Sequence, residues 1–283
     1  MNWRDYPLEE LRRQYLTNLT PGMGDHVRRY EELSDELVRT MPGKLDIAYG
    51  AAGPRQMLDV FTPDKGGAPI LVFIHGGYWF FNSKDPRRFP AREFVPRDIA
   101  WVPINYRLAP TVTMSGIVAD VRNAVKWLYQ HAAQYGCDPE RIYVSGNSAG
   151  GHLTAELLSD DWPEQYGLPA DVVKGACAIS GLYELEPLLE CEPNEKLRLD
   201  LESARRYSPI YHLSGQATPS IIACGANESA EFRRQTAAYA DILKEAGYPV
   251  THMEVAGHDH FSIIGELANP ESPLFRAVIG MIA

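Results

Sequence analysis

The feature that most constrains the fold is a regular alternation of apolar strands and amphipathic helices from residue 68 onward. Strands buried on both faces read as near-continuous apolar runs, and strands joined through helices lie parallel in one sheet. Helices are expected at about 116–135, from residue 152, at about 229–246 and at the C-terminus. The pattern therefore predicts an α/β protein with a mostly parallel central sheet flanked by helices. The strand segments are APILVFI (68–74), IAWVPINY (99–106), RIYVSG (141–146), VKGACAIS (173–180), PSIIACG (219–225) and VTHMEVA (250–256).

The residues before this alternation follow a different period. Apolar residues recur at helical spacing over 8–19 and again over 27–38, which predicts an N-terminal helical segment at 1–40. Two short strands are expected next, at 44–50 and 55–63, around a turn. At 283 residues the chain suits one large domain, 1–283, and an irregular acidic stretch at about 184–206 is the candidate cap or lid.

Composition excludes several classes of partner. The net charge is −10 and no basic stripe is present, so nucleic acid is not an expected partner. The N-terminus is charged where a signal peptide would be apolar, and the apolar runs are too short to cross a membrane. A soluble cytoplasmic protein is expected, with a homodimer as one assembly. Three of the four cysteines read as buried or free thiols rather than as a disulfide framework: Cys137, Cys177 and Cys224.

The strongest chemical signal is SGNSAGG, in which residues 146–150 fit the pattern G-x-S-x-G. An apolar strand ends at Gly146 and an amphipathic helix begins just after Ser148. A sharp strand–turn–helix elbow of this kind exposes a serine oxygen at the carboxyl edge of the sheet. The motif is short, and a structural glycine-rich turn is the alternative. Its context favours Ser148 as a nucleophile.

A nucleophilic serine needs donors for the oxyanion, and FIHGGYW (73–79) can supply them. The loop follows a buried strand, and Gly76 and Gly77 let the backbone bend so that N–H groups point into the site. The expected donors lie in this loop, at Gly77 and Tyr78 beside Gly76, together with Ala149 after the nucleophile. His75 is expected to brace the loop through its ring. The alternative is a turn that only ends the strand.

A carboxylate should lie between the serine and the histidine in the chain. In IIACGANESAEF a strand ends at Gly225 and a helix begins near Ser229, which leaves Glu228 on the connecting loop. A glutamate there can accept a histidine N–H and fix its tautomer. It can equally be an acid favoured by the helix dipole. Glu231 and Asp259 are nearby competitors.

The segment GHDHF places His258 and His260 two positions apart, just past the last predicted strand. An H-x-H pair becomes a metal site only with further ligands, and no H-E-x-x-H or similar companion is present. A serine elbow, an oxyanion loop and an acid in chain order favour a general base instead. His260 is the expected base, His258 is the fallback, and neither a metal nor a cofactor is required.

Aromatic residues follow the oxyanion glycines directly: Tyr78, Trp79, Phe80 and Phe81. Such clusters are often core. The functional alternative is one wall of an apolar pocket, with Tyr78, Trp79 and Phe80 contacting substrate. His152, soon after the elbow, is expected to pack locally, and NYRLAP (105–110) is expected to be structural.

The chain resembles the kynurenine formamidase (arylformamidase) group of α/β-hydrolases over nearly its whole length. The resemblance rests on LEELRRQY, HGGYW with Lys84 following, GNSAGGHL, ESAEFRRQ and the ending DHF. It implies that His260 is the catalytic histidine and that His258 occupies a variable position. Glu228 stands where the family carries aspartate, and Asn147 stands where histidine is frequent. NYRLAP is more similar to hormone-sensitive-lipase-type esterases.

The expected reaction is acyl transfer through a triad of Ser148, His260 and Glu228. The resemblance implies a formyl acyl group and an aryl amine leaving group, as in N-formyl-L-kynurenine, an intermediate of tryptophan catabolism. The same residues suit a carboxylesterase for short-chain or aryl esters. A non-catalytic binding protein on a hydrolase scaffold is a further alternative, although such a protein would normally have lost a triad member.

Overall fold

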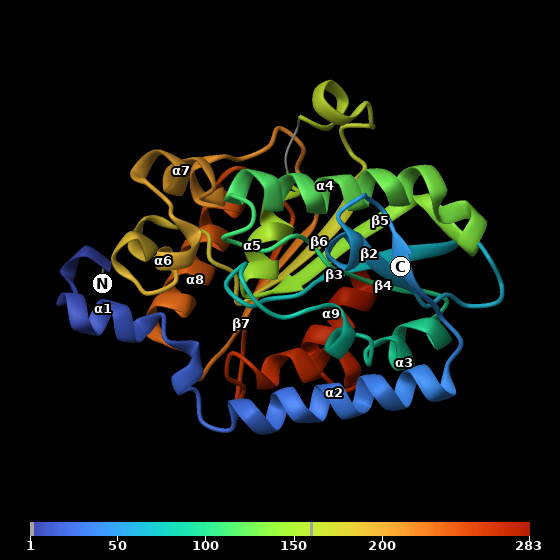
Figure 1. Ribbon diagram of the computed structural model, residues 1–283, viewed down its shortest axis with the longest axis horizontal. Helices are drawn as coiled ribbons and strands as arrows, with labels where there is room; N and C mark the ends of the chain where they lie inside the picture. The colour runs from blue at the N-terminus through green and yellow to red at the C-terminus, as the bar shows by residue number, and fades with distance from the viewer. Residues whose placement is uncertain (1–2, 159–160) are drawn as a thin grey trace.

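The computed structural model describes residues 3–158 and 161–283. The described residues form an eight-stranded sheet in the order β1-β2-β4-β3-β5-β6-β7-β8 (Figure 1). The strands β3 to β8 run parallel, while β2 pairs antiparallel with β1 and with β4. The mostly parallel sheet predicted from the alternation is confirmed. Its strands are β1 (Lys44–Ala48), β2 (Met57–Val60), β3 (Ala68–Ile74), β4 (Ala100–Ile104), β5 (Cys137–Asn147), β6 (Val173–Ile179), β7 (Ser220–Gly225) and β8 (Val250–Val255).

Helices cover both faces of the sheet. The apolar stripe of α4 (Met114–His131) packs with α5 (Ala149–Glu156) in the larger core cluster, and α8 (Ala230–Glu245) packs on Ile222 of β7 beside α5. The opposite face is covered by α2 (Met23–Thr40), α3 (Ala91–Phe94) and α9 (Pro273–Ile282). Every residue of β3 and β4 is buried, as expected for strands enclosed on both faces.

The expected helical segment at the N-terminus is present as α1 (Leu8–Gln14) and α2. The stretch 184–206 contains two short helices, α6 (Asn194–Leu197) and α7 (Leu201–Arg206). Figure 1 shows α1, α6 and α7 gathered at one end of the molecule. The Trp3 indole donates to Glu184 at 2.7 Å, and Arg4 pairs with Glu186 at 2.9 Å. The N-terminal segment and the 184–206 stretch are therefore joined through side chains.

All four cysteines are buried and free, Cys191 included, which adds Cys191 to the expected set. In the described ranges, every helix is too short or too polar to cross a membrane.

Candidate active site

Ser148 sits at a sharp turn between β5, which ends at Asn147, and α5, which begins at Ala149. Its backbone has φ 58° and ψ −122°, a conformation that non-glycine residues adopt only when the surroundings impose it. The Ser148 N–H donates to the carbonyl of Ile179 at 2.8 Å, which holds the turn against β6. The predicted elbow is therefore formed, and 4% of Ser148 is exposed.

The two glycines of the elbow are required by close packing. A Cβ added at Gly150 would lie 2.0 Å from the carbonyl oxygen of Ile74, and one added at Gly146 would lie 2.4 Å from the carbonyl oxygen of Gly150. Any side chain at either position would force α5 away from the central strands. The sequence pattern G-x-S-x-G thus follows from the contact between the helix and β3.

The loop after β3 lies directly against the serine. A Cβ at Gly76 would stand 2.9 Å from the Cβ of Ser148. The following residues Gly77, Tyr78 and Trp79 have φ values of 116°, 45° and 59°, so the chain makes an unusual left-handed run. Within the described ranges, the N–H groups of Gly76, Gly77, Tyr78 and Ala149 donate no hydrogen bond to the protein. They are free to donate to a ligand.

The loop is held from behind by buried rings. The Trp79 indole N–H donates to His152 Nδ1 at 3.2 Å, and His152 Nε2 donates to the carbonyl of Tyr207 at 2.8 Å. His75 Nδ1 lies 2.7 Å from Gly76 O, and its ring stacks on Tyr106 at 4.3 Å. Burial lowers the pKa of His75 to about 3 and that of His152 to about 4, so both rings stay neutral.

This packing corrects part of the expected substrate pocket. Trp79 has 0% of its surface exposed, so it supports the loop and cannot contact substrate without rearrangement. Tyr78 is 6% exposed, whereas Phe80 is half-buried and stacks over Tyr78. NYRLAP is structural as expected, because Asn105 accepts the backbone N–H of Lys84 at 2.7 Å beyond the loop.

Glu228 and His260 are joined by a hydrogen bond of 2.7 Å between Oε2 and Nδ1. The other carboxylate oxygen accepts Ser180 Oγ at 2.5 Å and the Gly225 N–H at 2.7 Å. The Glu228 side chain is 1% exposed, so both oxygens are fully committed inside the protein. The opposite nitrogen of His260, Nε2, is left as the one able to act on a substrate.

Ser180 was not predicted from the sequence. It follows β6, has φ 52° and is completely buried. Its position at the carboxyl end of the strand next to β7 is the only signal that could have indicated it. A serine offers no titratable group, and a strand-ending serine is common, so the pattern alone does not distinguish it.

The residues that were alternatives to Glu228 and His260 bond to other partners. Glu231 accepts the Tyr15 hydroxyl at 3.0 Å and pairs with Arg234, while Asp259 accepts the N–H groups of Phe261 and Ser262. His258 Nε2 faces Glu266 Oε1 at 3.5 Å. The two histidines therefore serve different carboxylates. Within the described residues, no group of three or more His, Cys, Asp or Glu side chains is placed to hold a metal ion.

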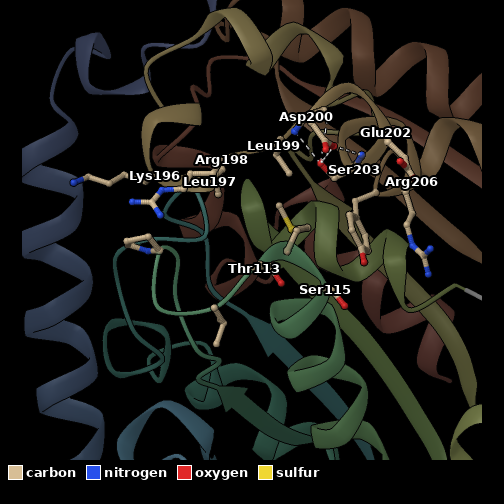
Figure 2. A pocket seen from close by; sticks show the side chains of 14 residues that line it. Thr113, Ser115, Lys196, Leu197, Arg198, Leu199, Asp200, Glu202, Ser203 and Arg206 are labelled. Atoms are coloured by element: carbon tan, nitrogen blue, oxygen red, sulfur yellow. Dashed lines mark hydrogen bonds between the residues drawn. The ribbon is translucent and has the colours of Figure 1, made fainter.

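A surface cavity of about 530 Å³ lies between the start of α4 and the 196–207 stretch. Its lining includes Thr113, Ser115, Lys196 and Arg206 but not Ser148 or His260. Figure 2 shows Lys196 and Arg206 pointing away from each other, so these two basic side chains do not converge on one ligand. The cavity is distinct from the serine and its neighbours.

Glu156, at the end of α5, makes stability depend on pH. Burial raises the pKa of its carboxyl from 4.5 to about 7, with Asp161 adding to the shift and Arg122 and Arg206 opposing it; His152 lies 3.9 Å away. Because the pKa in the folded state lies above the unfolded value, the contribution of Glu156 to stability is fully present below pH 4.5. This contribution is lost as the pH rises through about 7. The free energy of unfolding of the parent protein is therefore expected to fall by roughly 2–3 kcal/mol between about pH 5 and 8 on account of Glu156. Glu156→Gln should not show this fall, because the amide does not ionise.

Urea unfolding of both proteins across this pH range would measure the effect. The free energy of unfolding of the variant should increase relative to that of the parent as the pH rises. An identical pH dependence in the two proteins would show that Glu156 ionises normally.

The sequence matches two known families and several known proteins. Residues 115–271 match the prolyl oligopeptidase family, and residues 58–159 match the family described as BD-FAE. The chain is 32% identical to kynurenine formamidase of Danio rerio over 99% of this chain and 98% of that protein. It is 30% identical to esterase LipQ of Mycobacterium tuberculosis over 89% of this chain and 62% of that protein.

Solved structures with the same fold include a protein from Silicibacter sp. that has been proposed as a thioesterase. It superimposes with a TM-score of 0.84 at 28% identity, covering 95% of this chain and 99% of that one. An esterase of Pyrobaculum calidifontis superimposes with a TM-score of 0.71 at 21% identity, covering 97% and 96%.

Proposed function

The chain belongs to the kynurenine formamidase family of α/β-hydrolase enzymes, and from that premise we propose that it hydrolyses an aryl formamide through Ser148, His260 and Glu228. The observation that carries the proposal is the 2.7 Å bond between Glu228 and His260 at the same sheet edge as the Ser148 elbow. The full-length relationship to kynurenine formamidases supports the substrate class.

In the proposed reaction Ser148 Oγ attacks the formyl carbon while His260 Nε2 takes the hydroxyl proton. Glu228 keeps the proton on Nδ1 and stabilises the imidazolium. Within the described chain, Ser148 Oγ has no hydrogen-bond partner, and we expect its bond to His260 to form when substrate binds. The oxyanion is held by the N–H groups of Gly77, Tyr78 and Ala149, with Gly76 shaping the loop.

Collapse of the tetrahedral adduct breaks the C–N bond, and His260 returns its proton to the leaving nitrogen. An aryl amine leaves more readily than an alkyl amine because the ring delocalises the nitrogen lone pair. Water then attacks the formyl-serine with His260 as base, which releases formate and restores the hydroxyl. The protein itself supplies every group used, and small-molecule substrate is the only partner the reaction needs.

The enclosure of the site also favours a small acyl group. Ser148 is 4% exposed and His260 is 5% exposed, so little room is open beside the nucleophile. A formyl group carries only hydrogen on the acyl carbon. A carboxylesterase for short-chain esters is the second candidate, because esterases are among the relatives and use the same groups.

The test is kcat/KM for N-formyl-L-kynurenine, p-nitrophenyl acetate and p-nitrophenyl butyrate on one enzyme sample. We expect the formamide to be preferred, at about 10⁴ M⁻¹s⁻¹ or above, with acetate hydrolysed faster than butyrate. Efficient ester turnover with negligible formamide hydrolysis would remove the formamidase proposal and leave the esterase. Loss of activity on chelation would contradict the serine mechanism.

A further inference from the structure

The C-terminal end of α1 touches both sides of the candidate active site. The last carbonyls of a helix have no partner within the helix and must be satisfied from outside. Here the carbonyl of Gln14 accepts Ser229 Oγ at 2.7 Å, and the carbonyl of Tyr15 accepts the Tyr78 hydroxyl. Ser229 directly follows Glu228 in the loop 226–229, called the acid loop below, and Tyr78 lies in the oxyanion loop. Two adjacent carbonyls therefore join the acid loop to the oxyanion loop.

Tyr15 is itself fixed in place. Its side chain is 1% exposed, its hydroxyl donates to Glu231 Oε2 at 3.0 Å, and it accepts Gln235 Nε2 at 2.8 Å. Glu231 and Gln235 both belong to α8, the helix that follows the acid loop. Tyr15 and Phe232 rings lie 6.0 Å apart, and Phe232 contacts the His260 ring at 4.6 Å. The end of α1 is thus anchored to the helix that directly follows the loop carrying Glu228.

We propose that the end of α1 is a positioning element for catalysis: by accepting the Tyr78 hydroxyl, the Tyr15 carbonyl fixes where the backbone N–H of Tyr78 points in the oxyanion hole. The proposal rests on the acyl-transfer function given above. The Tyr78 side chain acts as a positioning group, while its N–H contacts the oxyanion. Ser229 and the Gln14 carbonyl do the same for the acid loop.

The need for an anchor follows from the backbone of the oxyanion loop. Tyr78 has φ 45°, a conformation that costs free energy for a residue with a Cβ. The Gly77 carbonyl of the same peptide accepts the N–H groups of Phe80 and Phe81 at 3.0 and 3.1 Å, so loss of the side-chain tether is expected to tilt the Tyr78 N–H rather than to release the loop. Burial raises the pKa of Tyr78, so the phenol stays protonated and remains a donor to Tyr15. The hydroxyl is therefore a permanent tether.

The experiment compares the full-length enzyme with its Tyr78→Phe variant, which keeps the ring and loses only the tether. We expect kcat to fall by about 10-fold with KM within about twofold, because an oxyanion donor acts mainly in the transition state. Phenylboronic acid forms a tetrahedral adduct on a nucleophilic serine, so its affinity should fall by the same factor. The pH–rate profile should keep its shape, because the Glu228–His260 pair is untouched.

Tyr248→Phe is the matched control. Tyr248 is a buried tyrosine whose hydroxyl donates to the backbone carbonyl of Ser214, just before β8 and away from the carboxyl edge. It should share any loss of melting temperature but not the loss of boronate affinity. Ser229→Ala adds a second variant: its effect on kcat should be smaller in the Tyr78→Phe background than alone, since both act through α1.

The outcomes are separable. Unchanged kcat and boronate affinity in Tyr78→Phe, with a normal parent enzyme, would overturn the positioning role alone. A fall in kcat matched in Tyr248→Phe would also overturn it, as a general loss of stability. A parent enzyme that forms no serine adduct with boronate or with a fluorophosphonate would overturn the proposed function and the positioning role together.

Discussion

Replacing Ser148 with alanine is expected to lower kcat by about 10⁴-fold or more while leaving the fold intact. In the proposed reaction the hydroxyl forms the acyl-enzyme, and alanine has no oxygen that could replace it. Alanine fits the site, because Ser148 Oγ makes no hydrogen bond to the described part of the chain. Binding of substrate should be retained, since the loops that surround the site keep their contacts.

The measurement is single-turnover hydrolysis of the best substrate by the purified variant, with substrate affinity measured separately by calorimetry. The melting temperature serves as the control for folding. Retention of activity within about tenfold of the parent would show that the reaction does not pass through Ser148. A binding protein on this scaffold would instead show the same affinity and no turnover in both proteins.

Glu228→Gln is the second large effect, an expected loss of about 10³–10⁴-fold in kcat with little change in KM. The parent carboxylate accepts three hydrogen bonds, from His260, Ser180 and the Gly225 N–H. An amide can accept on only one side. If its NH₂ faced Gly225, two donors would meet in a buried site, so the NH₂ should face His260 instead. His260 must then present a lone pair at Nδ1, and Nε2 carries the proton and cannot act as a base.

Rate measurements over a range of pH check this prediction, with Ser180→Ala as the matched variant. Ser180→Ala removes one donor to the carboxylate and keeps its charge, so we expect a loss of about tenfold or less. Activity of Glu228→Gln close to that of the parent would exclude Glu228 as the acid. Glu231→Gln would then be the next variant to measure.

Much of the site could be predicted because its chemistry is local in the chain. The elbow follows from a strand, a G-x-S-x-G turn and a helix, and the oxyanion loop follows from two glycines after a buried strand. His260 and Glu228 each lie on a short loop after a parallel strand. Parallel strands deliver such loops to one edge of the sheet, so proximity follows from alternation alone.

The rest depends on contacts between distant parts of the chain. The spatial place of β4 between β2 and β3 is not readable from the chain order. Trp79 was a candidate both for the core and for one wall of a substrate pocket; its indole reaches His152, 73 positions away, and this bond keeps it in the core. Ser180 and Tyr15 donate hydrogen bonds to partners 48 and 216 positions away. The helices at 194–197 and 201–206 are too short for periodicity to show.

The two chain ends differ in their distance from the chemistry. Trp3 and Arg4 are bound to the 184–206 stretch, and α1 ends against the oxyanion and acid loops. Near the other end of the chain, by contrast, the Ile282 carbonyl accepts Arg141 at the start of RIYVSG, away from the carboxyl edge of the sheet. Affinity tags and fusion partners therefore belong on the C-terminus. Attached at the N-terminus, they are expected to disturb the contacts of α1 with the oxyanion and acid loops and so to lower the activity.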